Sequence, residues 1–229
     1  MLTYCKQATK SQKRPFIVFS VNGQVVAKSS QDAEYRKMIL QADALDADGQ
    51  PLVWASRLLT RNPLPERVAT TDLFGDAAKM AEANGLRFYL LGSNQKNLTI
   101  ALTKIKSLYP NLIIAGHRNG YFKKHEEPSI VQHIQSVKTD VLWVGLGVPK
   151  QEEFVLRNRN ALTGVSWIKT CGGLFDYFTP SIKRAPAWMQ KLCLEWLFRT
   201  IQEPRKYFWR YFTTNSVAAW ILLTRTKSI

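Results

Sequence analysis

An apolar run that stops at glycines and passes into a polar helical pattern is the feature of this chain that most constrains its fold. The run covers 141–146, the turn 147–149, and the helical pattern begins at 150–152. Branched and aromatic residues bounded by glycines predict a strand buried on both faces, followed here by the first turn of a helix. In open parallel sheets, ligands bind where strand ends meet helix N-termini, because glycines admit the ligand and free N–H groups favour anions. Gly147 therefore marks a candidate site for a phosphorylated or sugar-like ligand.

The next apolar run, 165–170, ends in the same way, at Gly172 and Gly173. Two successive strands of a parallel sheet would bring these glycine turns to the same edge. The alternative is that the glycines only allow the chain to turn.

Strand-like and helical patterns alternate almost throughout the sequence. The strand-like segments are 16–20, 87–91, 112–115, 141–146 and 165–169, and the helical ones lie near 31–42, 50–60, 72–84, 95–107, 127–137 and 149–160. This alternation predicts an α/β fold, a mostly parallel Rossmann-like sheet flanked by helices. We expect residues 1–181 to form this core and residues 182–229 to form a basic, aromatic-rich helical C-terminal appendage.

The chain carries 32 Lys and Arg against 17 Asp and Glu, a net charge of +15. This excess indicates anionic partners, namely nucleic acid, phosphorylated substrates or an anionic membrane surface. No nucleic-acid-binding motif accompanies the charge, so we expect no nucleic acid among the partners. The three cysteines lack disulfide or zinc spacing, which favours a reducing cytoplasm, and no apolar run has the length of a signal peptide core or a membrane span.

The segment 182–229 differs in composition from the rest of the chain. It holds nine Lys and Arg, two Glu and four of the seven tryptophans. Trp188, Leu192, Trp196 and Arg199 recur at the spacing of one helix, and Pro204 predicts the start of a second. Aromatic residues interleaved with cations are typical of a membrane interface, whereas two ordinary helices packed on the core are the alternative.

Polar residues at the ends of predicted elements are candidates for chemistry. Ser20 and Asn22 follow the first strand, where their ordinary roles are turn and helix cap. Asp48 precedes an amphipathic helix and is either its cap or a general base toward a sugar hydroxyl. Arg67 is either an anion ligand or an ordinary surface residue.

Asp46 and Asp48 also resemble the Asp-x-Asp pair that holds a divalent metal in many glycosyltransferases. Such a pair should follow a long apolar strand, whereas the residues before Asp46 predict a helix and a short Ala-Leu run. We therefore expect no metal and no cofactor, and a metal-dependent sugar transferase that uses Asp46 and Asp48 is the alternative.

Taken in order, a series of motifs resembles the bacterial WecG/TagA/CpsF glycosyltransferases (glycosyltransferase family 26). The motifs are Ser20-Val-Asn22, Asp48-Gly49, Glu66-Arg67-Val-x-x-Thr71-Asp72-Leu, Leu90-Leu-Gly92, Gly120-Tyr-Phe122, Gly147-x-Pro-Lys-Gln151-Glu152, Gly172-Gly173-x-Phe-Asp176, Lys183-Arg184-Ala-Pro186 and Glu195-Trp-Leu-Phe-Arg199 with Gln202-Glu-Pro-Arg205. Two departures are that the family usually has Thr at the position of Ser20, and that the chain begins close to the first matched strand. Either the family's usual N-terminal segment is dispensable here or the start is truncated.

The resemblance implies an inverting, metal-independent transfer of a sugar from a UDP donor to an undecaprenyl-diphosphate-linked acceptor, in bacterial surface polysaccharide or teichoic acid synthesis. The donated sugar would be N-acetylmannosamine, its uronic acid or glucose. The protein would be cytoplasmic, bound peripherally to an anionic membrane surface on the inner face of the cytoplasmic membrane. A homo-oligomer is compatible with the resemblance.

The resemblance also assigns roles to individual residues. Asp48 corresponds to the family's proposed base, Gln151 to its active-site glutamine, and Ser20 with Asn22 to its sugar-binding pair. Arg199, Arg205 and Arg210 lie in the C-terminal segment, whose arginines in the family reach over the active site and help to bind the donor or leaving diphosphate. We expect Asp48, Gln151, Arg199 and Arg205 to be catalytic, and Ser20, Asn22, Arg67, Gly92, Gly147, Gly172, Gly173 and Arg210 to bind substrate. A non-enzymatic nucleotide- or nucleic-acid-binding α/β module is the alternative from a different class.

Overall fold

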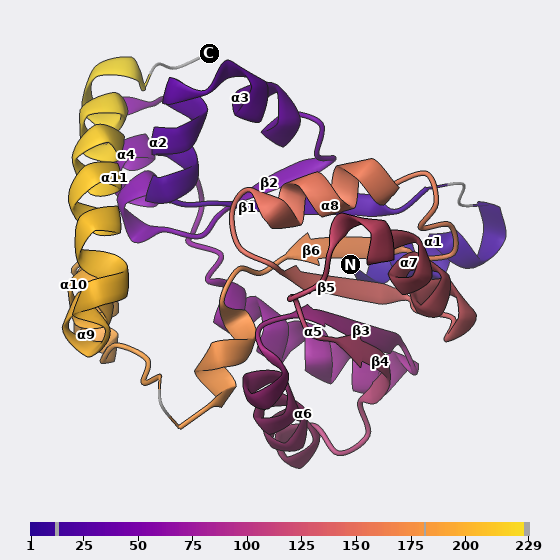
Figure 1. The fold of residues 1–229 in the computed structure, drawn as a ribbon. Coiled ribbons are helices and arrows are strands. Elements are labelled where there is room, and N and C mark those ends of the chain that lie inside the picture. The colour runs from indigo at the N-terminus through magenta and orange to yellow at the C-terminus, as the bar shows by residue number, and fades with distance from the viewer. Residues whose placement is uncertain (12–13, 181, 227–229) are drawn as a thin grey trace. The chain divides into compact units, whose positions relative to one another are not determined.

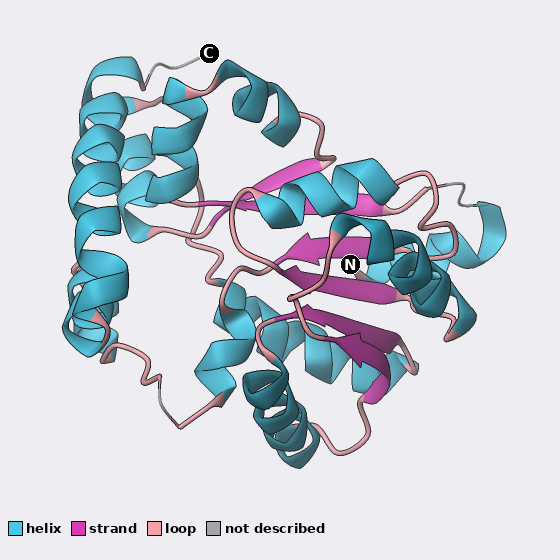
Figure 2. Cartoon of the chain, viewed as in Figure 1, coloured by secondary structure: helices cyan, strands magenta, loops and turns pink. Residues whose placement is uncertain are grey.

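The computed structural model describes residues 1–11, 14–180 and 182–226 and contains a six-stranded sheet of order β2-β1-β6-β5-β3-β4 (Figures 1 and 2). The strands are β1 (Phe16–Val21), β2 (Ala44–Ala47), β3 (Arg87–Gly92), β4 (Ile113–Arg118), β5 (Val141–Gly145) and β6 (Trp167–Thr170). Neighbours from β1 through β6, β5 and β3 to β4 pair in parallel. This confirms the predicted Rossmann-like fold class.

The helices are α1 (Leu2–Ser11), α2 (Gly23–Gln31), α3 (Ala33–Ile39), α4 (Gln50–Leu59), α5 (Thr70–Asn84), α6 (Gln95–Leu108), α7 (Glu127–Ser136), α8 (Lys150–Asn158), α9 (Ala187–Lys191), α10 (Glu195–Gln202) and α11 (Pro204–Arg225), with short 3-10 helices η1 (Lys124–Glu126) and η2 (Leu174–Phe178). Helices α3 to α8 lie where the alternating pattern predicted helices, whereas α1 and α2 were not predicted. In the part of the chain that the structure describes, no helix is long and apolar enough to cross a membrane.

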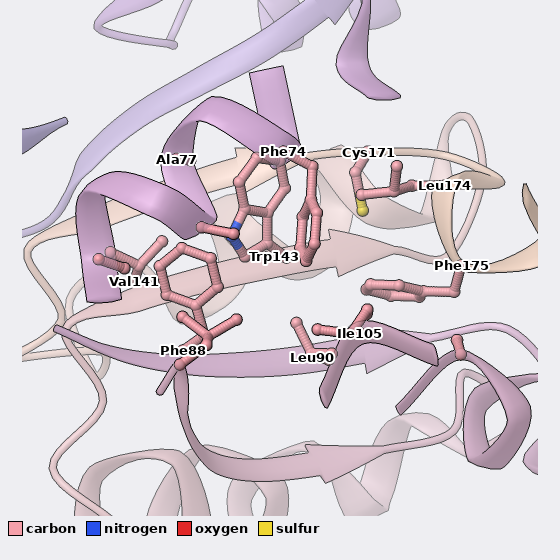
Figure 3. Close-up of a cluster of buried hydrophobic side chains, with 14 of the residues drawn as sticks. Phe74, Ala77, Phe88, Leu90, Ile105, Val141, Trp143, Cys171, Leu174 and Phe175 are labelled. Atoms are coloured by element: carbon pink, nitrogen blue, oxygen red, sulfur yellow. The ribbon is translucent and has the colours of Figure 1, made fainter. Parts of the chain in front are cut away.

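Side-chain alternation along the central strands packs helices against both faces of the sheet. On one face, Trp143 of β5 meets Phe74 of α5 edge to face, with ring centroids 4.9 Å apart, within a buried cluster that also takes in residues of α6 (Figure 3). On the other face, the hydroxyl of Tyr89 of β3 lies 3.0 Å from Nδ1 of His133 in α7. Every residue of β5 is buried, as expected for a strand with neighbours on both sides.

The chain divides into two compact units. The sheet unit comprises Met1–Phe19, Gln41–Ala44 and Thr70–Ser181, and the helical unit comprises Ser20–Leu40, Leu45–Ala69 and Ile182–Ile229. In the helical unit α11 packs against α2, α4 and α10. Tyr207 and Ala218 of α11 are buried, whereas Phe208, Trp209 and Phe212 are exposed.

One expected helix of the C-terminal segment is interrupted, so the prediction of continuous helical spacing from Trp188 to Arg199 was wrong. Helix α9 ends at Lys191 and α10 begins at Glu195. Between them Cys193 has a φ of 62°, the left-handed conformation that an α-helix of L residues cannot accommodate. The predicted second helix does begin at Pro204.

Candidate active site

The predicted Gly92, and Gly145, which was not predicted, lie where neighbouring main chains approach closely, at the carboxyl ends of β3 and β5 in the sheet unit. A Cβ atom on Gly92 would collide with the carbonyl oxygen of Gly145, and one on Gly145 would lie 2.7 Å from the carbonyl oxygen of Gly172. Any side chain at Gly92 or Gly145 would therefore force the strand ends apart. Packing alone explains the need for glycine at Gly92.

Gly147 and Gly172 are in a different situation, because both lie in open turns. Their φ angles are 77° and 52°, in the left-handed region that favours glycine. Apart from the adjacent residues, no described residue has an atom within 4 Å of a Cβ placed on either. Gly173, next along, is exposed. These turns leave main chain accessible at the ends of β5 and β6, where parallel sheets bind ligands.

Gln151, predicted to be catalytic, lies beneath the Gly172 turn rather than on an open surface. Its side chain is 2% exposed. Its Oε1 accepts a hydrogen bond from the Gly172 amide at 3.0 Å, and its Nε2 donates to Oε1 of Glu152 at 2.7 Å. Both ends of the Gln151 amide are therefore used within the protein.

Glu152 is fully buried, and this burial raises its pKa to about 7. No role was predicted for Glu152 from the sequence. The pattern that could have indicated its burial is its spacing of three residues from Val155, which places both on the inward-packing face of α8.

Asp176 is a second residue that the sequence analysis quoted only within a motif. One of its carboxylate oxygens accepts hydrogen bonds from the Ser93 hydroxyl at 2.5 Å and from Nδ2 of Asn97 at 3.0 Å. Ser93 follows Gly92, and Asn97 lies in the first turn of α6. Asp176 therefore ties the segment after Gly172 and Gly173 to the turn after β3.

In the helical unit, Asp48 is not the N-cap residue of the helix that follows it. That position belongs to Gly49, which has no side chain to bond to the helix end. The Asp48 amide donates to the carbonyl of Val21 at 2.8 Å, which brings Asp48 beside the end of β1.

Asn22 caps a helix, which was the alternative to its predicted role in sugar binding. Its Oδ1 accepts hydrogen bonds from the amides of Gln24 and Val25 at 3.0 and 3.2 Å and so caps α2. Its side-chain amide group is not used by this cap. Ser20, two residues earlier, is buried.

Arg67 lies between two carboxylates, all three side chains being partly buried. Its Nη2 is 3.8 Å from Oδ1 of Asp48 and 2.5 Å from Oε2 of Glu195. The backbone bond from the Val68 amide to the Ala47 carbonyl, 3.0 Å long, places Arg67 along β2. Arg67 Nε is buried and lacks a hydrogen-bond partner among the residues that the structure describes. Arg67 is thus not an ordinary surface residue.

The expectation for the residues before Asp48 also needs correction. A helix, α3, does precede Asp46, but the short Ala-Leu run is the start of a strand, β2, that includes Asp46. Among the described residues no three His, Cys, Asp or Glu side chains are grouped to hold a metal. The carboxylate of Asp48 lies near a positively charged side chain, that of Arg67.

Two arginines of the C-terminal segment converge on one aromatic ring. The Arg210 guanidinium carbon lies 4.5 Å from the Tyr207 ring centroid and 4.6 Å from that of Tyr211, and the Arg199 carbon lies 5.4 Å from Tyr207. Arg210 Nε is buried without a hydrogen-bond partner in residues 1–11, 14–180 and 182–226. Arg205 is exposed at the start of α11. Tyr207, which the sequence analysis gave no site role, fixes the direction of both clustered arginines.

Comparison with known proteins agrees with this arrangement of motifs. The profile of the family described as "Glycosyl transferase WecG/TagA/CpsF family" matches residues 1–228. A protein of Bacillus subtilis (strain 168), named N-acetylglucosaminyldiphosphoundecaprenol N-acetyl-beta-D-mannosaminyltransferase, is 31% identical over 221 residues, which cover 96% of this chain and 83% of that protein. A Staphylococcus aureus (strain MW2) protein of the same name is 32% identical over 196 residues, 86% of this chain and 75% of its own length.

A match over nearly the whole chain, together with relatives above 30% identity, leaves one conclusion about its class. The chain is a glycosyltransferase, and it belongs to the WecG/TagA/CpsF family.

Proposed function

We propose that this glycosyltransferase moves N-acetylmannosamine from UDP to an undecaprenyl-diphosphate-linked N-acetylglucosamine, with inversion and without a metal. The names of the relatives support the acceptor and the transferred sugar. N-acetylmannosaminuronic acid and glucose are the other donor sugars to compare. The family assignment decides against a non-enzymatic binding module.

The observation that carries the proposal is the carboxylate of Asp48, which follows β2 and lies beside Arg67. In a single displacement Asp48 takes the proton of the acceptor hydroxyl, and that oxygen forms a bond to the anomeric carbon. The bond from this carbon to the UDP oxygen breaks on the opposite face, and UDP leaves with the electron pair. The configuration at the anomeric carbon is therefore inverted.

The negative charge that develops on UDP needs fixed positive groups. Arg67 and Arg210 each have a buried Nε–H without a partner among the described residues, which is costly unless a ligand accepts from it. A diphosphate offers several acceptors and pairs well with guanidinium groups. We assign Arg67, Arg199, Arg205 and Arg210 to the diphosphate, and the open turns at Gly147 and Gly172 to the donor.

Contact with an anionic membrane is assigned to the exposed side of α9–α11. The apolar residues on it are Trp188, Leu192, Phe208, Trp209, Phe212, Trp220 and Leu223. Exposed Lys183, Arg184, Lys191 and Arg205 lie in the same segment. Aromatic rings enter the headgroup region while cations meet anionic lipid, which suits peripheral binding at the cytoplasmic face, where a UDP-sugar is available.

The test is UDP release from a set of UDP-sugars with a lipid-diphosphate-linked N-acetylglucosamine, in excess chelator. Wild-type turnover should persist, and Asp48→Asn should lower kcat by roughly 100- to 10,000-fold with the donor KM little changed. Asp76→Asn, an exposed aspartate of α5, is the matched control and should behave as wild type. Near-normal turnover of folded Asp48→Asn would remove the base. Activity that needs added manganese or magnesium would favour the transferase that binds a metal through Asp46 and Asp48.

A further inference from the structure

We propose that Glu152 is a positioning residue, which holds the amide of Gln151 in the one orientation that supports the Gly172–Gly173 turn. The inference rests on the proposed function, in which this turn meets the donor.

Hydrogen-bond polarity is the first step. The Gly172 amide can only donate, so it needs the oxygen end of the Gln151 side chain, 3.0 Å away. The oxygen of Glu152 at 2.7 Å accepts from the nitrogen end of the same amide. With the amide turned over, two donors would face each other at Gly172 and two oxygens at Glu152. Glu152 thus selects the useful orientation of Gln151.

Burial is the second step. Glu152 is fully buried, and its Oε2 has no hydrogen-bond partner among the described residues. A carboxyl group in such a place costs stability, and an apolar residue of similar volume would avoid the cost. Packing therefore does not account for a glutamate here, whereas its bond to Gln151 does.

The surroundings of Glu152 contain two other charged groups that influence it. Burial is the main reason that its pKa is raised to about 7, Glu153 adds to the rise, and Lys169 opposes it. Lys169 of β6 is itself fully buried, and its Nζ donates to the carbonyl of Thr170 at 3.1 Å. Near neutral pH, Glu152 therefore exchanges between a charged acceptor and a weaker neutral one.

This exchange reaches the turn through Gln151. Gly172 follows β6 and has a φ of 52°. Apart from the adjacent residues, no described residue has an atom within 4 Å of a Cβ placed on Gly172. A stronger Glu152 to Gln151 bond fixes the Gly172 amide more firmly, so the donor meets a preorganised turn. Ionisation of Glu152 should thus tighten donor binding.

The experiment compares Glu152→Leu and Glu152→Gln with wild type and with a control, Glu153→Gln. Glu153 is the next residue of α8 and pairs with Arg157 at 3.3 Å, away from Gln151. Glu152→Leu should raise the donor KM by roughly 10- to 100-fold, the range for loss of a hydrogen bond to a charged group, with a smaller change in kcat. Glu152→Gln can still accept a hydrogen bond from Gln151, as neutral Glu152 does. At every pH its donor KM should equal the KM that wild type has near pH 6, where Glu152 is mostly protonated.

Two readouts separate positioning from a merely structural role. The donor KM of wild type should fall as pH rises through about 7. Glu153→Gln should show the same fall at a somewhat lower pH, because Glu153 adds to the rise in the pKa of Glu152, and Glu152→Gln should lack the step. Hydrogen exchange of the Gly172 amide should be faster in Glu152→Leu than in wild type or Glu153→Gln, with or without turnover. If the wild-type protein transfers no sugar, the proposed function is refuted but the positioning role of Glu152 is not, because hydrogen exchange at Gly172 is measured without turnover. Unchanged exchange at Gly172 in folded Glu152→Leu, or a KM step that persists in Glu152→Gln, would overturn the positioning role.

Discussion

The guanidinium of Arg67 lies closer to Glu195 than to Asp48, at 2.5 Å against 3.8 Å. Glu195 is in the first turn of α10, where a carboxylate is favoured by the helix dipole. Arg67 is therefore shared between an acid of the C-terminal segment and the proposed base. The share taken by Glu195 limits the positive charge that acts on Asp48.

Glu195→Gln should consequently impair the base. With Glu195 neutral, the charge of Arg67 is directed to Asp48, and a carboxylate paired with a full cation accepts a proton less readily. We expect kcat to fall by roughly 3- to 10-fold, with the donor KM unchanged or lower. Glu34→Gln, an exposed acid of α3, is the control. A kcat equal to that of wild type would mean that Glu195 does not tune this site.

Asn22 caps α2, and one pair of substitutions can separate this role from its predicted role in sugar binding. Asn22→Ser keeps an oxygen to cap α2, so the free energy of unfolding should stay within about 0.5 kcal/mol of wild type, while Asn22→Ala should lose about 1 kcal/mol. Both variants lack the side-chain amide, so both should raise the donor KM. Urea unfolding and steady-state kinetics measure the two effects. If Asn22→Ser kept the wild-type KM, Asn22 would be a cap only.

The exposed aromatic residues of α11 should be needed for vesicle binding but not for folding. Trp209 and Phe212 are 70% and 63% exposed, so the double change to Ser removes apolar surface without opening the core. Binding to anionic vesicles should weaken by about 10-fold or more. Tyr121→Ser, at a residue 78% exposed in the sheet unit, is the control. Vesicle sedimentation measures binding, and an unchanged profile for the double variant would place the membrane contact elsewhere.

Substitution is the better test of this segment than truncation. Helix α11 packs against α2 and α4 and buries Tyr207 and Ala218. Removing residues 182–229 would uncover those apolar partners, so a loss of lipid binding would be confounded with a loss of folding.

Glu152 should make the stability of the protein depend on pH. Its pKa is about 7 in the folded protein against an ordinary value of 4.5, so the folded state binds an extra proton between these values. The contribution of Glu152 to stability is therefore fully present below about pH 4.5 and is lost as pH rises to about 7, a decline of roughly 3 kcal/mol. Glu152→Gln should lack this decline, so at about pH 8 its free energy of unfolding should exceed that of wild type. Urea titrations near pH 5 and pH 8 measure the difference, and an equal decline in both proteins would show that another group is responsible.

The sequence predicted the strands with the strongest patterns and missed the weakest. β5 is apolar throughout and buried on both faces, so its pattern was clear. β2 has only four residues, one of them Asp46, and they are partly exposed, which gives no apolar run to detect. Helix α2 was likewise missed. Its buried residues are Val25 and Ala27, and two buried residues give too weak a helical pattern to detect.

The candidate site was predictable as far as it depends on local patterns. Glycine turns after apolar strands predicted the open backbone at Gly147 and Gly172. Arg67 and Glu195 lie far apart in the chain, and no local sequence pattern around either residue indicates that the two pair. The burial of Gln151 was hidden for a different reason, since a polar side chain in the first turn of a helix is ordinarily exposed.

The close approach of Gly92, Gly145 and Gly172 means that the ends of β3 and β5 and the turn after β6 meet through peptide groups instead of side chains. Peptide groups are the same in every protein, so this contact has no chemical character of its own with which to tell one hexose from another. If the donor binds at this edge, as proposed, discrimination between donor sugars must arise in the side chains around these glycines. Attempts to redirect the enzyme to a new donor should leave the three glycines untouched and vary their neighbours.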